Sequence, residues 1–278
     1  MSAPTSPDAG TARTAQPAAP SARAPRGRLG LRTLFVKEVR RFLRVPGQTL
    51  LSPLITTTLY LVVFGFSLGG RLREVEGVAY ARFIVPGLIA LGVISNAYLN
   101  TASSMFVMKI QGTIVDILVA PLSYAEILAG FLGAAVVRGL MVGGLMWLVA
   151  GAFNGFDLAH PALAIAVLVL IAILFAALGL ITSIWATSFE QVNFFPTFII
   201  TPLTFLGGVF YSVGMLPPAL QKLTWVNPVF YMVDAVRLGF LGVSDAPVAV
   251  GLLLVGILAA IAVGCAWLLL RSGYKLRG

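Results

Sequence analysis

Residues 161–187 read PALAIAVLVLIAILFAALGLITSIWAT and include no Asp, Glu, Lys or Arg. At the 1.5 Å rise per residue of an α-helix, roughly 20 apolar residues cross the hydrocarbon core of a bilayer, which is about 30 Å thick. This segment is long enough to do so. The whole chain is 59% hydrophobic and only 10% charged, more apolar surface than the core of a soluble domain could bury. The stretch therefore predicts a transmembrane helix.

Other charge-poor intervals of similar length occur along the chain, so we expect an all-α membrane protein with six transmembrane helices. The expected spans are about 48–69, 83–106, 125–151, 161–187, 191–211 and 247–270. From Ile127 onward, the third span contains one charged residue, Arg138. An even number of spans places both termini on the same side of the membrane.

The basic residues predict which side that is. Nine precede Pro46, Lys109 follows the second span and three follow Leu270, whereas only five fall in the segments on the other side. Cytoplasmic loops of membrane proteins carry the excess of Lys and Arg, so both termini are expected in the cytoplasm. The net charge of +9 then reflects a membrane surface, and no nucleic-acid partner is expected.

The N-terminal region divides into two parts. Residues 1–28 are rich in Ala, Pro, Ser and Thr and are expected to form a disordered cytoplasmic tail. Residues 29–46 place apolar and basic residues on opposite helix faces, which predicts an amphipathic helix in the inner interface. Its arginines could bind anionic lipid phosphates without any protein partner. Residues 47–278 are the expected transmembrane domain.

The segment 212–245 is too interrupted by proline to span the membrane and too apolar for an ordinary loop. We expect a re-entrant outer hairpin between the fifth and sixth spans, with Asn227 and Pro228 starting its second helix. Three charged residues of this hairpin, Lys222, Asp234 and Arg237, are expected near the headgroups.

Catalytic chemistry has little support. The single histidine, His160, cannot form a metal site or a nucleophile and base pair alone, so no catalytic and no metal site is expected. None of the four lysines follows a glycine, so the GxxxxGK[ST] phosphate-binding loop is missing. The chain is therefore not expected to be an enzyme or to hydrolyse ATP by itself.

Polar residues inside the expected spans fall on single helix faces. The pathway-lining candidates are Asn96, Asn100 and Ser103 in the second span and Asn193, Thr197, Thr201 and Thr204 in the fifth. Such residues either line a path for substrate or hydrogen-bond neighbouring helices, and both readings stay open. Arg138 sits near mid-bilayer, where it must find carbonyls, a carboxylate or water. It is either a structural anchor among glycines or a substrate contact.

The longest cytoplasmic connection follows the second span and reads KIQGTIVDILVAPLSYAE from Lys109. It predicts a short helix over 113–119 that ends before Pro121. An exposed helix here could receive a push from a soluble partner, although a plain connector would look the same.

Seven segments, in order, resemble the membrane subunits of type-2 ABC transporters, in particular the YadH-like subgroup of bacterial inner-membrane permeases. They are KEVRRFLR at Lys37, RFIVPGLI at Arg82, LVAPLS at Leu118, VRGL around Arg138, TPLTFLGGVFYS at Thr201, LPP at Leu216 and NPVFYMVDAVRLGFLG at Asn227. Only residues 1–28 lie clearly outside this resemblance.

The resemblance implies a dimer of membrane subunits carried on two copies of a cytoplasmic ABC ATPase, with ATP and Mg in that partner and no cofactor in this chain. It implies a bacterial inner-membrane location, a pathway near the second and fifth helices, and a coupling helix after the second span. The coupling residues it suggests are Gly112, Thr113, Asp116, Ile117, Leu118 and Pro121.

The function expected from this resemblance is the transmembrane subunit of an ATP-driven exporter working by alternating access. A secondary transporter, or a membrane scaffold or translocase subunit without ATP coupling, is the alternative. No Asp or Glu falls within the charge-free runs, which disfavours a secondary transporter driven by protons or sodium. The substrate stays open among drugs, lipids and lipid-linked glycans.

Overall fold

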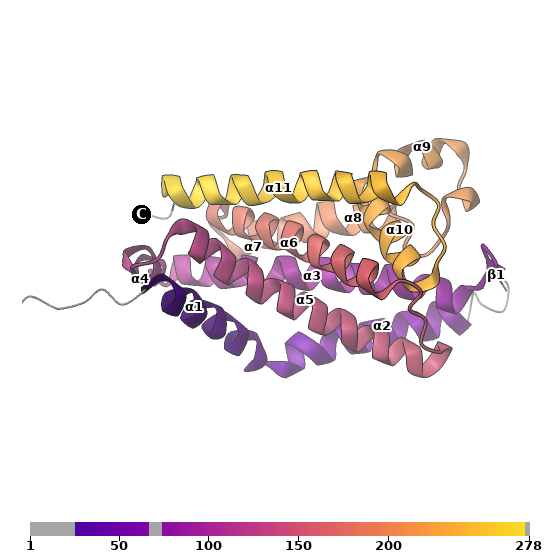
Figure 1. Ribbon diagram of the computed structural model, residues 1–278, viewed down its shortest axis with the longest axis horizontal. Coiled ribbons are helices and arrows are strands. Elements are labelled where there is room, and N and C mark those ends of the chain that lie inside the picture. The colour runs from indigo at the N-terminus through magenta and orange to yellow at the C-terminus, as the bar shows by residue number, and fades with distance from the viewer. Residues whose placement is uncertain (1–25, 67–73, 276–278) are drawn as a thin grey trace, which may run out of the picture.

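A computed structural model of the protein describes residues 26–66 and 74–275. Long helices run roughly parallel and antiparallel to one another, and short helices and loops lie at both ends of the bundle (Figure 1). Five helices in the described residues are long and apolar enough to cross a membrane: Gly47–Phe64, Tyr80–Ile110, Tyr124–Asn154, Pro161–Trp185 and Val248–Ser272. The expectation of an all-α membrane protein is confirmed at this level.

The described chain forms the following elements. They are α1 (Arg26–Leu43), η1 (Gly47–Leu51), α2 (Ser52–Tyr60), η2 (Leu61–Phe66), β1 (Glu74–Val75), β2 (Val78–Ala79), α3 (Tyr80–Ile110), α4 (Ile114–Val119), α5 (Tyr124–Asn154), α6 (Pro161–Trp185), α7 (Phe189–Phe195), η3 (Pro196–Ile200), α8 (Thr201–Phe205), η4 (Val213–Met215), α9 (Pro218–Val226), α10 (Pro228–Leu241) and α11 (Val248–Ser272). The two short strands pair antiparallel in one hairpin.

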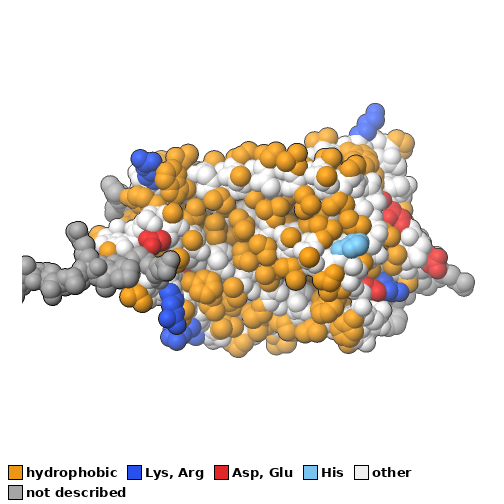
Figure 2. Space-filling view, in the orientation of Figure 1, with side chains coloured by type: hydrophobic (Ala, Val, Ile, Leu, Met, Phe, Trp, Pro, Cys, Tyr) orange, Lys and Arg blue, Asp and Glu red, His pale blue; other side chains and the backbone are white. Residues whose placement is uncertain are grey.

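The start of α1, the short helix α4 and the end of α11 lie at one end of the bundle, whereas β1, α9 and α10 lie at the other (Figure 1). Figure 2 shows apolar side chains over the middle of the visible face and charged ones gathered towards the two ends. This separation of charge from a wide apolar band is the pattern of a protein surrounded by lipid.

Helix α3 is the centre of the bundle, and most of its side chains are buried between α5 and α6. The close approach of α6 requires Gly179, because a Cβ atom there would overlap the carbonyl oxygen of Tyr98. The hydroxyl of Thr101 donates to the carbonyl of Ala176 at 2.7 Å across the same contact. Small residues allow backbones in membranes to come this near.

Two spans contain π-helical turns next to proline. Pro53 follows η1, and Pro196 and Pro202 lie within the α7, η3 and α8 run, where each removes a backbone donor from the helix ladder. The expected fifth span, 191–211, is therefore helical only over Phe189–Phe205, in three joined pieces. Its last residues form turns instead, because the helix ends at Leu206 and Gly208 adopts a φ of 74°.

Helix α1 matches the expected amphipathic helix in position, with boundaries shifted to Arg26–Leu43. It buries Leu34 and Phe42 and leaves Arg40 exposed. The buried face also contains Glu38, which the sequence did not single out. The first 25 residues of the expected tail, and residues 67–69 of the expected first span, lie outside the described residues.

Helix α10 begins as expected from its sequence. The side chain of Asn227 accepts a hydrogen bond from the backbone N–H of Val229 at 3.0 Å, Pro228 occupies the first turn, and Gly242 ends the helix in a left-handed conformation. Asp234 and Arg237, which were expected near the headgroups, are both buried inside the protein. They point into the protein to contact each other and three other segments.

Candidate functional site in a groove between spans

A groove of about 330 Å³ opens between η1, α2, α3, α5 and α8. One wall carries a polar row from the first span, formed by Gln48, Ser52 and Thr56, all of which are exposed. Thr201 of α8 faces the same space. Apart from Ser95, Asn96 and Arg138, the other walls are mainly apolar and come from Tyr60, Leu88, Leu91, Leu99, Met146 and Phe205. The groove combines a polar lining with apolar walls, at the small end of the size range of ligand sites.

Arg138 lines this groove midway along α5. Its guanidinium Nη2 donates to the side-chain oxygen of Asn96 on α3 at 3.1 Å, and its buried Nε has no hydrogen-bond partner in the part of the chain that the structure describes. Among the described residues, no carboxylate lies within ion-pair distance of it. The partner of Arg138 is therefore an amide, so the cation is held in place without being neutralised.

The polar row of the second span has mixed surroundings. Asn96 borders the groove, whereas the side chain of Asn100 is fully buried and accepts a hydrogen bond from Arg41 of α1 at 3.0 Å. Ser103 bonds the backbone of its own helix, with its hydroxyl 2.6 Å from the carbonyl of Leu99. Asn100 thus ties α1 to α3, and of the three residues only Asn96 reaches the groove.

The polar row of the fifth span lies mostly on an open surface. Asn193, Thr197 and Thr201 are exposed along α7, η3 and α8, whereas Thr204 is buried and donates to the carbonyl of Ile200 at 2.8 Å. Apolar Phe198 is exposed beside them. Exposing a polar row of a span to lipid costs free energy. These residues are therefore expected to face water or another protein surface.

Helix α1 meets α3 through a buried charge cluster. Glu38 is fully buried and accepts hydrogen bonds from Arg41 at 3.0 Å and from Ser104 of α3 at 2.7 Å. Because Arg41 also contacts Asn100, these four polar side chains join the two helices at one point. Any displacement of α1 must therefore move α3 or break this cluster.

The short helix expected over 113–119 is present as α4 (Ile114–Val119) in the connection between α3 and α5, and its coupling role stays a prediction. Ile114 and Ile117 are buried against the bundle, whereas Asp116 is exposed, as are Val115 and Val119, the latter by 76%. The remaining coupling candidates surround it: Gly112, Thr113 and Pro121 are exposed and Leu118 is half-buried. The short helix thus presents an apolar and acidic face at the end of the bundle where α1 starts and α11 ends (Figure 1).

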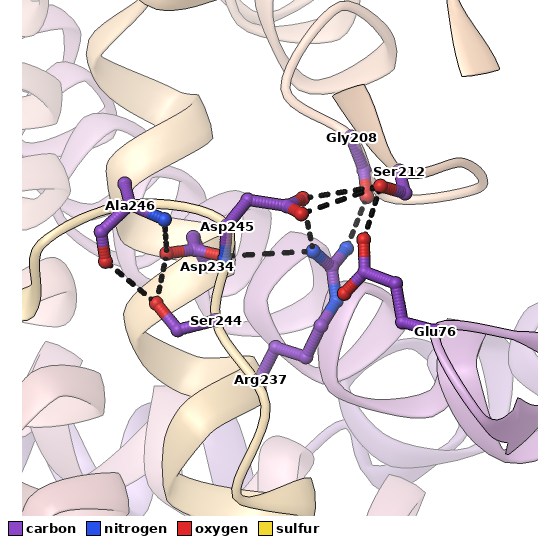
Figure 3. A network of polar contacts seen from close by, with 8 residues as sticks. All are labelled: Glu76, Gly208, Ser212, Asp234, Arg237, Ser244, Asp245 and Ala246. Atoms are coloured by element: carbon purple, nitrogen blue, oxygen red, sulfur yellow. Dashed lines mark hydrogen bonds and ion pairs between the residues drawn. The ribbon is translucent and has the colours of Figure 1, made fainter. Parts of the chain in front are cut away.

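The opposite end is held by a polar network around Arg237 (Figure 3). Arg237 is fully buried, lies over the ring of Phe83 at 4.1 Å, donates to the carbonyl of Gly208 at 2.5 Å and pairs with Asp234 at 3.7 Å and Asp245 at 3.5 Å. The Ser212 hydroxyl donates to Glu76, which lies in the hairpin turn between β1 and β2. Four separate segments therefore meet at one cation.

Burial raises the pKa of Glu76 above its ordinary value of 4.5, and the hydrogen bond with Asp245 and the negative charge of Asp245 raise it further. The hydroxyl of Ser212 and the charge of Arg237 act in the opposite direction. The net direction is upward, so Glu76 retains its proton at a higher pH than an exposed glutamate would.

Sequence reasoning missed the row of Gln48, Ser52 and Thr56, the burial of Glu38 and the role of Asp234. Gln48, Ser52 and Thr56 are four residues apart, which places them on one helix face. Asp234 and Arg237 are three residues apart, which allows them to pair on one helix. Glu38 interrupts the apolar face of α1 and could have been noticed for that reason. In residues 26–66 and 74–275, no group of three or more His, Cys, Asp or Glu side chains could hold a metal ion.

Long apolar helices, charged ends and polar contacts between spans define a multi-pass helical membrane protein. The chain belongs to the ABC-2 type transporter family, whose model matches residues 30–241. It is 43% identical over 251 residues to the inner membrane transport permease YadH of Escherichia coli strain K12, covering 90% of this chain and 97% of that protein. It is also 29% identical over 200 residues to nodulation protein J of Rhizobium meliloti strain 1021, covering 72% of this chain and 76% of that protein. The inner-membrane permease among these relatives and the apolar spans together support a multi-pass protein of the bacterial inner membrane.

Proposed function

We propose that the chain is the transmembrane subunit of an ABC exporter, works as a dimer and is driven by two copies of a separate cytoplasmic ATPase that binds ATP and Mg. In the topology we infer, there are six spans with Phe189–Phe205 as the fifth, and both termini are cytoplasmic. The start of α1 and the end of α11 then lie on the cytoplasmic side, as does α4. In this arrangement α1 is the interface helix, and α9 and α10 form the outer re-entrant hairpin.

The observation that carries the proposal is the exposed face of α4. Val119 is 76% exposed at the end of the bundle where α1 starts and α11 ends. A helix that anchors two isoleucines and presents Val115, Asp116 and Val119 to the outside suits a docking contact for a soluble partner better than a simple connector.

The cluster of Glu38, Arg41, Ser104 and Asn100 supports a route from this end into the spans. We infer that the partner acts on α4 and α1, and that α1 passes the movement to α3 and to the groove. ATP can drive this change only by the difference in partner affinity between the two arrangements of the membrane subunits. The exposed rows of the first and fifth spans would then face the pathway or the second copy.

Co-purification with the cytoplasmic ATPase tests the proposal, and the chain offers a matched pair of variants. Val119→Asp changes an exposed valine of α4, whereas Val226→Asp changes a valine that is 80% exposed on α9, at the opposite end. The first should lower the ATPase retained by roughly tenfold or more, equivalent to about 1.4 kcal/mol of binding, and the second should have no effect. Equal retention by both variants would contradict the docking role of α4.

One observation supports the secondary-transporter alternative: the carboxylate of Glu38 is fully buried, and its Oε1 has no hydrogen-bond partner among residues 26–66 and 74–275. Ion-driven transporters use buried carboxylates of this kind. However, Glu38 is paired with Arg41 and lies in α1 outside the spans, which favours a structural role. Transport that persists without any ATPase would restore this alternative. If the chain showed no transport and bound no ATPase, a scaffold role would be favoured.

A further inference from the structure

We propose that the groove beside Arg138 binds the negatively charged head group of a lipid-like molecule, with Arg138 as the anion contact. This inference rests on the proposed function, since it names the chemical class of molecule that the membrane subunit would take. It assigns to Arg138 a ligand-binding role in place of the purely structural one.

The first argument is the unbalanced charge of Arg138. Its guanidinium carries five N–H donors, and Asn96 is the hydrogen-bond partner observed for it among the described residues. An arginine at the centre of a span is costly in free energy unless its charge is compensated. By contrast, the nearby cation Arg41 has a buried carboxylate, Glu38, at 3.0 Å. Among the described residues, Arg138 therefore lacks the counter-ion that Arg41 has.

The second argument is the position of Asn96. An amide accepts a hydrogen bond from Arg138 without neutralising it, and it also fixes the guanidinium at the wall of the groove. The Nδ2 of Asn96 is already committed to the carbonyl of Gly92 at 3.0 Å, so its oxygen is turned to the arginine. A guanidinium that is already held in position and keeps its full charge can form charge-assisted hydrogen bonds with a phosphate or carboxylate.

The third argument is the lining of the groove. Gln48, Ser52 and Thr56 form a hydrogen-bonding row that leads along the first span, and Thr201 adds a hydroxyl from the fifth. Apolar side chains such as Leu91 and Phe205 complete the walls. A free inorganic anion would gain nothing from these walls, whereas a molecule with a charged head and an apolar chain would satisfy both surfaces.

The test uses the full chain in phosphatidylcholine nanodiscs and radiolabelled dodecyl phosphate as the probe. Dodecylphosphocholine has the same chain but a zwitterionic head, and inorganic phosphate has no chain. The wild-type protein should bind dodecyl phosphate in a way that unlabelled dodecyl phosphate displaces, and neither of the other two compounds should displace it at the same concentration.

Arg138→Gln should weaken this binding by about tenfold or more, since a hydrogen bond to a charged group contributes about 1.5–3 kcal/mol. Asn96→Asp gives Arg138 an internal counter-ion of equal size and should weaken binding as strongly, so the test survives if Arg138→Gln fails to fold. Thr56→Trp fills the groove from an exposed position and should also abolish binding. Arg82→Gln, which changes a partly exposed arginine paired with Asp157, is the matched control and should leave binding unchanged.

Three results would overturn the inference. Equal displacement by dodecylphosphocholine would show that the head-group charge is not recognised, and displacement by inorganic phosphate would show that the chain is not needed. Undiminished binding in Asn96→Asp and Thr56→Trp would place the binding elsewhere on the protein. Because no ATPase is required, failure here leaves the co-purification result, and hence the proposed function, untouched.

Discussion

Replacing Arg237 with Met should be among the most destabilising single changes in this protein. The substitution keeps the apolar stem and removes a fully buried cation that pairs with Asp234 and Asp245 and donates to the carbonyl of Gly208. Removing one partner of a buried ion pair typically costs about 3–5 kcal/mol, because the remaining charge is left uncompensated. Here two carboxylates and one carbonyl lose their partner, so a loss of about 4 kcal/mol is expected.

The measurement is equilibrium unfolding in mixed micelles with increasing sodium dodecyl sulfate. The matched control is Arg82→Met at the same end of the bundle, where Arg82 and Asp157 are 44% and 27% exposed. A pair of that exposure contributes about 0–1 kcal/mol. If the two variants unfold within about 1 kcal/mol of each other, Arg237 is not the cation that holds the outer segments together.

Three further predictions concern separate parts of the chain. The raised pKa of Glu76 means that the folded state holds a proton that the unfolded state releases, so stability should fall as pH rises from 4.5 through the folded pKa. Unfolding midpoints measured across this window should decrease with pH in the wild type and should not do so in Glu76→Gln. Gly179→Val should prevent α6 from packing against Tyr98 of α3, and detergent-purified protein should aggregate or melt at much lower temperature than Gly256→Val, whose site is open. Ser123→Ala removes the capping box that Ser123 forms with Glu126 at the start of α5 and should cost about 1 kcal/mol in the same unfolding assay.

Each of these has a clear contrary result. A pH slope that persists in the Glu76 variant would assign the titration to another group. Equal behaviour of the two glycine variants would mean that α3 and α6 are further apart than described. An unchanged free energy of unfolding in Ser123→Ala would mean that the first turn of α5 is held by other contacts.

The long spans could be predicted from the sequence because a run of charge-free residues indicates a span whatever the helix packs against. The region 161–187 is helical over Pro161–Trp185, and the α10 cap at Asn227 follows from local spacing alone. The fifth span was predicted too long, since the effect of its prolines on the helix ladder depends on how the neighbouring helices pack.

The contacts of the polar residues could not be predicted in the same way. Arg138 finds Asn96 across 42 residues of sequence, and Arg41 finds Asn100 across 59, and periodicity carries no information about which helix lies opposite. The burial of Arg237 was missed because a charged residue near a span end is usually assigned to the headgroups. Its partner Asp234, three residues earlier on the same helix, was the one local indication of a buried pair.

ATP hydrolysis by the purified complex in lipid tests the central claim most directly. Asp116→Ala alters the exposed face of α4, and Asp157→Ala, a change at the other end of the bundle, is its control. If α4 couples the ATPase to the membrane subunit, the first variant should lower turnover by about fivefold or more while the complex stays assembled, and the second should not. Wild-type turnover in Asp116→Ala, or an ATPase whose rate does not depend on this chain at all, would contradict the account.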